Sequence, residues 1–222
     1  MKSKRTELAV FILVLVAANI PLLFGRICKP LVFLPAQFAD GEWWRLLTFP
    51  FVHVSGYHLL LDASAFLLLY HGLQESSARR RILYVVACAA GSLGISLLSN
   101  PLSNGLCGLS GIAHGLMAIS ALELMRSTDR TLRNAGIICL LVVSLKSFYE
   151  AFTGQIAFNI LHLGSIGNAI AICHLGGILG GVSCYALLHL PKIKNEVGTK
   201  KTSGFTVPVN RKPLLVIRGD SQ

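Results

Sequence analysis

The chain has 222 residues, of which 53% are hydrophobic and only 14% are charged, and it carries a formal net charge of +10. This hydrophobic fraction exceeds that of ordinary soluble domains and predicts an integral membrane protein. The excess of basic residues is distributed as expected for membrane topology rather than gathered in one stretch, which argues against nucleic-acid binding.

Six apolar segments approach the roughly 20 residues with which a helix crosses a bilayer. They comprise residues 7–25, 56–73, 82–99, 108–126, 134–152 and 167–190. The first segment follows a short basic stretch, as in a signal peptide, but its long apolar run and the lack of a clear small-residue cleavage site favour a retained helix. We therefore predict an all-α membrane protein with six transmembrane helices over residues 7–190.

The basic residues are divided very unequally between the two predicted sides of the membrane. Only Arg26, Lys29 and Arg45 fall in the connections assigned to the outer side, whereas sixteen of the twenty lie in the two termini and the second and fourth connections. Because positive residues collect on the cytoplasmic side, we expect a cytoplasmic N-terminus at residues 1–6 and a basic, mostly disordered cytoplasmic tail at residues 191–222. The short chain without a targeting presequence suggests a bacterial inner membrane.

The first outer connection, residues 26–55, is too apolar and aromatic for an ordinary solvated linker. Trp43, Trp44 and Arg45 have the mixed character that favours the lipid headgroup level, so we expect this loop to be associated with the outer leaflet. An ordinary aromatic belt accounts for its composition equally well. The six cysteines show neither the spacing of a metal site nor that of a disulfide framework, and no metal or cofactor is predicted.

Three polar side chains are expected at one depth of the bundle. Ionisable residues inside membrane segments are costly to bury and are therefore candidates for function. The second, fourth and sixth segments all start on the predicted outer side, and a helix rises about 1.5 Å per residue. On this scale His58, Ser110 and His174 lie in the outer third of the membrane, where side chains from three helices can meet.

Ser110 and His174 together have the composition of a nucleophile and its base. Serine is a weak nucleophile unless a neighbouring base removes its proton, and histidine is the usual base. Ser110 also begins a helix, where free N–H groups and the helix dipole can stabilise an oxyanion. Taken singly, Ser110 is more simply explained as a helix N-cap and His174 as a buried structural histidine. Ile112 replaces the last glycine of G-x-S-x-G, which excludes an α/β-hydrolase elbow.

Glycines flank both side chains at helical spacing. Gly111 and Gly115 lie on the fourth segment, and Gly177 and Gly181 lie on the sixth. Small residues four apart allow two membrane helices to approach closely. We therefore expect the fourth and sixth helices to pack together and to bring the hydroxyl of Ser110 to the imidazole of His174. Gly108 and Gly111 would also leave space for a substrate backbone.

Four motifs, in this order, carry a resemblance to a known family: WWR in the first loop, HLLLD in the second segment, GLSG in the fourth and CHLGGILGG in the sixth. Over about residues 40–190 the chain resembles the rhomboid intramembrane serine proteases. This resemblance implies a rhomboid-like bundle in which Ser110 is the nucleophile and His174 the general base, without a third, acidic member. It further implies an oxyanion hole formed by His58, the residue at position 62 and the backbone N–H of Ser110.

Two finer features follow from the same resemblance. The Trp-Arg pair of the family's first loop falls on Trp44 and Arg45. The compact chain, the form GLSGIAHG with His114 and the lack of an extra folded domain most resemble the rhombosortase branch. That branch is associated with proteins that carry a glycine-rich, C-terminal membrane anchor, and the resemblance therefore implies removal of such anchors.

Asp62 departs from the family pattern, in which asparagine is common at this position. An ionised carboxylate beside an oxyanion would oppose catalysis. We expect Asp62 either to be neutral, because loss of hydration favours the uncharged acid, and to donate a hydrogen bond, or to orient His58. His114, one turn after Ser110, and Lys146 are rival bases, although Lys146 is more simply explained by an ion pair with Glu150.

The predicted function is that of a serine endopeptidase that cleaves single-span membrane proteins near the outer face of the lipid bilayer. Two other functions are compatible with the same residues. A catalytically inactive relative would bind membrane helices as a chaperone or sorting factor. A small transporter would use the buried histidines to relay protons. The sequence predicts no nucleic-acid partner and does not indicate an oligomeric state.

Overall fold

The structure is a computed structural model that describes residues 2–99, 105–157, 164 and 170–189. The predicted tail and most of the last outer connection lie outside these residues. Within the described part of the chain, six long helices form the bundle: α1 (Lys2–Asn19), α4 (Gly56–Gly72), α5 (Ala78–Ser99), α6 (Ser110–Met125), α7 (Arg130–Thr153) and α8 (Ile172–His189). The all-α fold class predicted from the sequence is therefore confirmed.

The predicted number of six membrane spans is not confirmed. Among the described residues, four helices are long and apolar enough to cross a membrane: Ser3–Phe24, Ala78–Leu98, Arg130–Thr153 and Ile172–His189. The helix α4 meets the criterion only together with Arg45–Phe51, from which it is bent by 96°, and α6 is shorter, with 16 residues.

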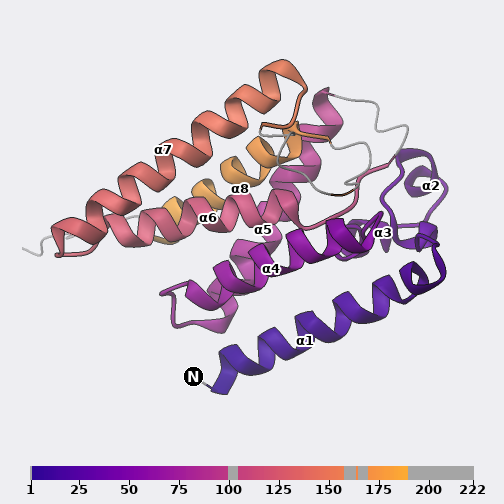
Figure 1. Cartoon of the computed structure of the whole chain (residues 1–222), viewed down its shortest axis with the longest axis horizontal. Helices are drawn as coiled ribbons and strands as arrows, with labels where there is room; N and C mark the ends of the chain where they lie inside the picture. Colours follow the sequence, from indigo (N-terminus) through magenta and orange to yellow (C-terminus); the bar gives the residue numbers. More distant parts are fainter. Residues whose placement is uncertain (1, 100–104, 158–163, 165–169, 190–222) are drawn as a thin grey trace, which may run out of the picture. The chain divides into compact units, whose positions relative to one another are not determined.

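The short helix α6 is enclosed by other helices. It contacts α4, α5, α7 and α8, and most of its residues are buried. Figure 1 shows α6 between α4 and α7, with α1 on the far side of α4. A helix that is surrounded by protein does not have to match the thickness of the hydrocarbon layer along its whole length. This enclosure explains why α6 can be shorter than the helices around it.

The helices α5 and α8 pack closely through glycines. A Cβ atom on Gly176 would lie 2.4 Å from the carbonyl oxygen of Gly91, and one on Gly180 would lie 2.1 Å from the carbonyl oxygen of Ala87. Neither distance leaves space for a side chain. These contacts fix α8 against α5, and the adjoining face of α8, with Gly177 and Gly181, meets α6.

Charged side chains join four helix ends at one end of the bundle. The guanidinium of Arg81 at the start of α5 is buried and binds both carboxylate oxygens of Glu7 in α1, at 2.6 and 2.9 Å. The hydroxyl of Tyr70 in α4 also donates to Glu7. At the end of α6, Glu123 accepts the backbone N–H groups of Gln74 and Glu75. These ends belong to the side that the charge distribution assigns to the cytoplasm.

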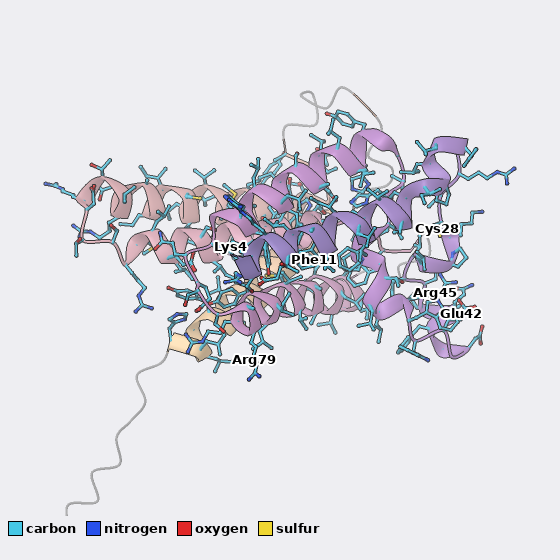
Figure 2. All side chains as sticks on the ribbon, turned by 90° about the horizontal axis from the view of Figure 1, so that it is seen from below. Lys4, Phe11, Cys28, Glu42, Arg45 and Arg79 are labelled. Carbon is cyan, nitrogen blue, oxygen red and sulfur yellow. The ribbon has the colours of Figure 1, made fainter. Side chains whose placement is uncertain are left out.

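The first outer connection is folded rather than extended. It contains η1 (Ile20–Phe24), η2 (Lys29–Leu31), α2 (Pro35–Ala39), α3 (Arg45–Thr48) and η3 (Phe49–Phe51). Arg45 is 5% exposed and donates to the carbonyl oxygens of Lys29 and Val32 and to the carboxylate of Glu42. Figure 2 shows Arg45 and Glu42 together at one end of the molecule, away from Arg79.

The Trp-Arg pair therefore serves the loop's own structure. The indole N–H of Trp44 donates to the carbonyl oxygen of Pro30 at 3.1 Å, so both residues hold the chain around η2. The neighbouring side chains of Trp43 and Leu47 are 63% and 67% exposed. The loop thus combines internal hydrogen bonds with exposed apolar side chains, as the prediction of a membrane-associated loop requires.

Candidate active site

The segment before α6 is fixed from two sides, and this places Ser110 as the first residue of the helix. Gly108 has a φ of +101°, which favours glycine, and its N–H donates to the carbonyl oxygen of Phe49 at 3.1 Å. The N–H of Leu109 donates to Asp62 Oδ2 at 2.8 Å. In the first turn of an α-helix the backbone N–H groups have no partner within the helix. The Ser110 N–H is therefore available beside its own hydroxyl.

The helices α6 and α8 cross at the glycines singled out in the sequence. A Cβ atom on Gly177 would lie 1.8 Å from the carbonyl oxygen of Gly111, and one on Gly115 would lie 2.4 Å from that of Gly177. Gly181 lies on the same face of α8 as Gly177, and a Cβ atom on it would lie 3.1 Å from the carbonyl oxygen of Gly115. Ser110 directly precedes Gly111, and His174 precedes Gly177 by about one turn. The crossing thus brings the two predicted catalytic residues to the same region.

Ser110 and His174 do not hydrogen-bond directly in this arrangement of the described residues. The contact of the Ser110 hydroxyl is with the thiol of Cys173, at an Oγ–Sγ distance of 3.7 Å. Cys173 directly precedes His174, and its thiol interacts with both the Ser110 hydroxyl and the His174 ring. The thiol of Cys173 therefore lies next to both members of the predicted dyad.

His174 has an acidic partner that the resemblance does not include. Its Nδ1 lies 2.7 Å from Oε2 of Glu150, a carboxylate on α7 with no exposed surface. A carboxylate accepts hydrogen bonds, so Nδ1 carries the hydrogen, and in the neutral imidazole Nε2 then presents its lone pair. The predicted ion pair of Glu150 with Lys146 is confirmed at 2.7 Å, but that pair uses the other carboxylate oxygen, Oε1.

His114 stacks on His174 and is not placed as a base for Ser110. The two rings are 3.9 Å apart between centroids and nearly parallel, with an interplanar angle of 11°. Nδ1 of His114 lies 2.7 Å from the carbonyl oxygen of Ser110, and Nε2 lies 3.0 Å from Nζ of Lys146. The carbonyl accepts and the ammonium donates, so both ring nitrogens of His114 are engaged. Lys146 is likewise directed at Glu150 and His114 rather than at the hydroxyl.

The same cluster contains groups that can ligate a metal ion. One ligand atom each from His114, Glu150 and His174 lie within 4.8 Å of one another. Imidazole and carboxylate ligands suit several divalent transition metals. The ammonium of Lys146, however, lies within 3.0 Å of two of these side chains. A metal ion would have to displace this cation from its position.

His58 and Asp62 lie beside the start of α6, as the prediction of an oxyanion site requires, but Asp62 has the contacts of an acceptor. Its Oδ2 lies 3.2 Å from Nε2 of His58 and 3.4 Å from Nε2 of His53, besides accepting the N–H of Leu109. A Cβ atom on Gly108 would meet Oδ2 at 2.9 Å and His58 Cε1 at 3.0 Å. This geometry supports the orienting role of Asp62 over that of a neutral donor.

His53 and Glu150 are the residues of the site that the sequence analysis did not assign. His53 is fully buried, and its ring contacts that of His58 at a centroid distance of 5.0 Å. It precedes α4 and reads in the sequence as part of the outer loop. Glu150 lies in the outer half of its predicted helix, as His174 does in its own, and this was the one signal for it. The ion pair with Lys146 already explained a buried carboxylate at this position, so Glu150 was not assigned to the active site.

Comparisons with known proteins point to one family. The rhomboid domain family matches residues 40–191. The chain is 27% identical over 158 residues to the rhomboid protease GluP of Bacillus subtilis (strain 168). This alignment covers 69% of this chain and 28% of GluP. It is 32% identical over 83 residues to YdcA of the same organism, whose name assigns it provisionally to the rhomboid proteases. That alignment covers 36% of this chain and 41% of YdcA.

These alignments cover less than half the length of either relative, and no solved structure matches the chain. The match to the rhomboid domain, in contrast, extends over more than half of the chain, and it includes α4 to α8 and the site between them. Together with the apolar helices, it shows that the chain belongs to the rhomboid family of integral membrane proteins.

Proposed function

We propose that this protein is an intramembrane serine endopeptidase in which Ser110 is the nucleophile and His174 is the general base. The crossing of α6 and α8 at Gly111 and Gly177 carries this proposal, because it brings the two residues together from distant parts of the chain. The Nδ1 contact to Glu150 leaves Nε2 of His174 with a lone pair for the serine proton. The names of both relatives support a protease.

The proposed reaction begins with a rotation of the Ser110 side chain away from the Cys173 thiol and towards His174. Nε2 of His174 then takes the hydroxyl proton while Oγ attacks the scissile carbonyl. The imidazolium returns the proton to the leaving amine, and water hydrolyses the acyl-enzyme in a second step. The developing oxyanion would be stabilised by the N–H of Ser110 and by His58, which Asp62 holds at the start of α6.

We propose that the substrates are single-span membrane proteins, and that cleavage occurs near the outer face of the bilayer with both termini of this chain in the cytoplasm. An intact membrane helix hides its carbonyl groups in its own hydrogen bonds. Segments rich in glycine unwind more readily. This reasoning favours the rhombosortase-like role in a bacterial inner membrane, namely removal of glycine-rich C-terminal anchors.

A serine-reactive probe tests the nucleophile without knowledge of the substrate. We expect a fluorophosphonate probe to label the detergent-solubilised full chain and to fail with Ser110→Ala. Ser120→Ala is a matched control, because Ser120 belongs to the same helix and its hydroxyl has no hydrogen-bond partner among the described residues. Labelling measured by gel fluorescence should be unchanged in this control. Absence of labelling in the wild type, with binding of membrane helices retained, would favour the inactive binder.

Substitutions of Asp62 test its proposed orienting role. Asp62→Asn retains an oxygen that can accept the N–H of Leu109, and the family commonly has asparagine here, so we expect a labelling rate within about tenfold of the wild type. Asp62→Leu leaves that buried N–H without a partner, which destabilises by about 1–3 kcal/mol. We expect its labelling rate to fall far more than that of Asp62→Asn. Loss of all labelling in Asp62→Asn would show instead that the negative charge itself is required.

A further inference from the structure

We propose that Glu150 is a positioning residue that holds His174 in its reactive tautomer, so that the site works as a Ser110–His174–Glu150 arrangement. This inference rests on the proposed function and extends it to a third helix, since Ser110 lies on α6, His174 on α8 and Glu150 on α7. The carrying observation is the contact of 2.7 Å between Glu150 Oε2 and His174 Nδ1.

The carboxylate of Glu150 is held at both of its oxygens. Oε2 accepts from His174, while Oε1 accepts from Nζ of Lys146 at 2.7 Å and from the backbone N–H of Ala157 at 3.0 Å. The residue has no exposed surface. With both oxygens bound, the carboxylate cannot rotate freely, so its direction towards His174 is fixed by the protein rather than by solvent.

A carboxylate in this position has two consequences for His174. It keeps the hydrogen on Nδ1, so that Nε2 remains the proton acceptor. It also stabilises the imidazolium that forms when Nε2 takes the proton of Ser110, because opposite charges attract strongly where water is excluded. The ammonium of Lys146 balances the buried carboxylate while His174 is neutral. A buried acid without such a partner would be strongly destabilising.

A stacking contact also holds the ring of His174 in position. His114 stacks on it at 3.9 Å, and His114 is itself held by the carbonyl oxygen of Ser110 and by Nζ of Lys146. The contacts therefore form a continuous chain from the carbonyl oxygen of Ser110 through His114, Lys146 and Glu150 to His174. An ion pair that only stabilised α7 would require Lys146 and Glu150 alone. The chain of contacts instead extends to the imidazole of His174 at the α6–α8 crossing.

The test is the kinetics of fluorophosphonate labelling of the detergent-solubilised full chain. Glu150→Gln retains the size of the side chain but removes its charge. We expect the maximal labelling rate constant to fall by about 100-fold or more, while the half-saturating probe concentration stays within about twofold. Glu150→Asp, with a carboxylate on a shorter side chain, should recover part of the rate. Thermal unfolding of each variant reports on folding separately from reactivity.

Glu123→Gln is the matched control, because Glu123 is also a buried glutamate but accepts backbone N–H groups at the other end of α6. It should label at the wild-type rate. A Glu150→Gln protein that labels at the wild-type rate overturns this inference and leaves the proposed function intact. Equal losses in Glu150→Gln and Glu150→Asp, each matched by loss of folding, would also overturn it. If the wild type is not labelled, or if Ser110→Ala is labelled, the proposed function fails as well.

Discussion

Replacement of His174 with alanine is expected to lower the rate of cleavage of a single-span reporter with a glycine-rich anchor by about 10⁴-fold or more. In the proposed mechanism the imidazole of His174 takes the Ser110 proton, and both ring nitrogens of His114 are already engaged. Without His174, the hydroxyl would have to lose its proton to water. The measurement is the initial rate of reporter cleavage in proteoliposomes.

His189→Ala is the matched control for this prediction. His189 is the last residue of the same helix, and its ring stacks on Tyr185 with a centroid distance of 4.2 Å, far from the crossing of α6 and α8. Its cleavage rate should remain within a few-fold of the wild type. A His174→Ala protein with near-normal cleavage, in a preparation where Ser110→Ala is inactive, would assign the base to another residue.

Replacement of Gly177 with alanine is expected to damage both stability and reactivity. The added methyl group would lie 1.8 Å from the carbonyl oxygen of Gly111, and backbone at that distance cannot yield as a flexible side chain can. Forcing additional atoms into a packed interior destabilises by about 1–3 kcal/mol. The helices must separate, and a displacement of about 1 Å between reacting groups can lower a rate by about 10²-fold.

The measurement pairs the midpoint of thermal unfolding with the fluorophosphonate labelling rate. Gly94→Ala, on the neighbouring helix α5, is the control, because among the described residues no atom outside this stretch of α5 lies within 4 Å of the Cβ position of Gly94. It should unfold at the wild-type temperature or slightly higher, since alanine favours the helix more than glycine does. Normal stability and labelling in Gly177→Ala would show that α6 and α8 are not held as closely as the structure indicates.

The positions of the long helices were predictable from hydropathy because each is an apolar segment between polar connections. The four glycines were predictable for a similar reason, since spacing along one helix marks one face. The depth of a side chain in the membrane was also predictable, because the number of residues from the end of the helix, multiplied by the rise per residue, gives its position along the helix axis. Depth was sufficient to propose His58, Ser110 and His174 as neighbours.

The direction in which a side chain points around its helix was not predictable, since that depends on which helices pack together. This is why Glu150 and His53 were missed although their places along the chain were known. From the sequence, Glu150 is explained by its ion pair with Lys146, and only the packing of α8 against α7 shows its contact with His174. His53 is assigned to a loop, and only the structure shows its contact with His58 of α4. The number of spans also depends on packing, because α6 is short only where neighbours surround it.

The enclosure of α6 determines how the protein would respond to membranes of different thickness. Hydrophobic mismatch is accommodated by tilt of the helices that meet lipid, or by local deformation of the bilayer. The helix that begins with Ser110 has protein on most of its surface, so mismatch reaches it only through its neighbours. In the proposed reaction, the depth at which a peptide bond would meet the Ser110 hydroxyl is therefore set by side-chain packing within the bundle rather than by the acyl chains of the host lipid.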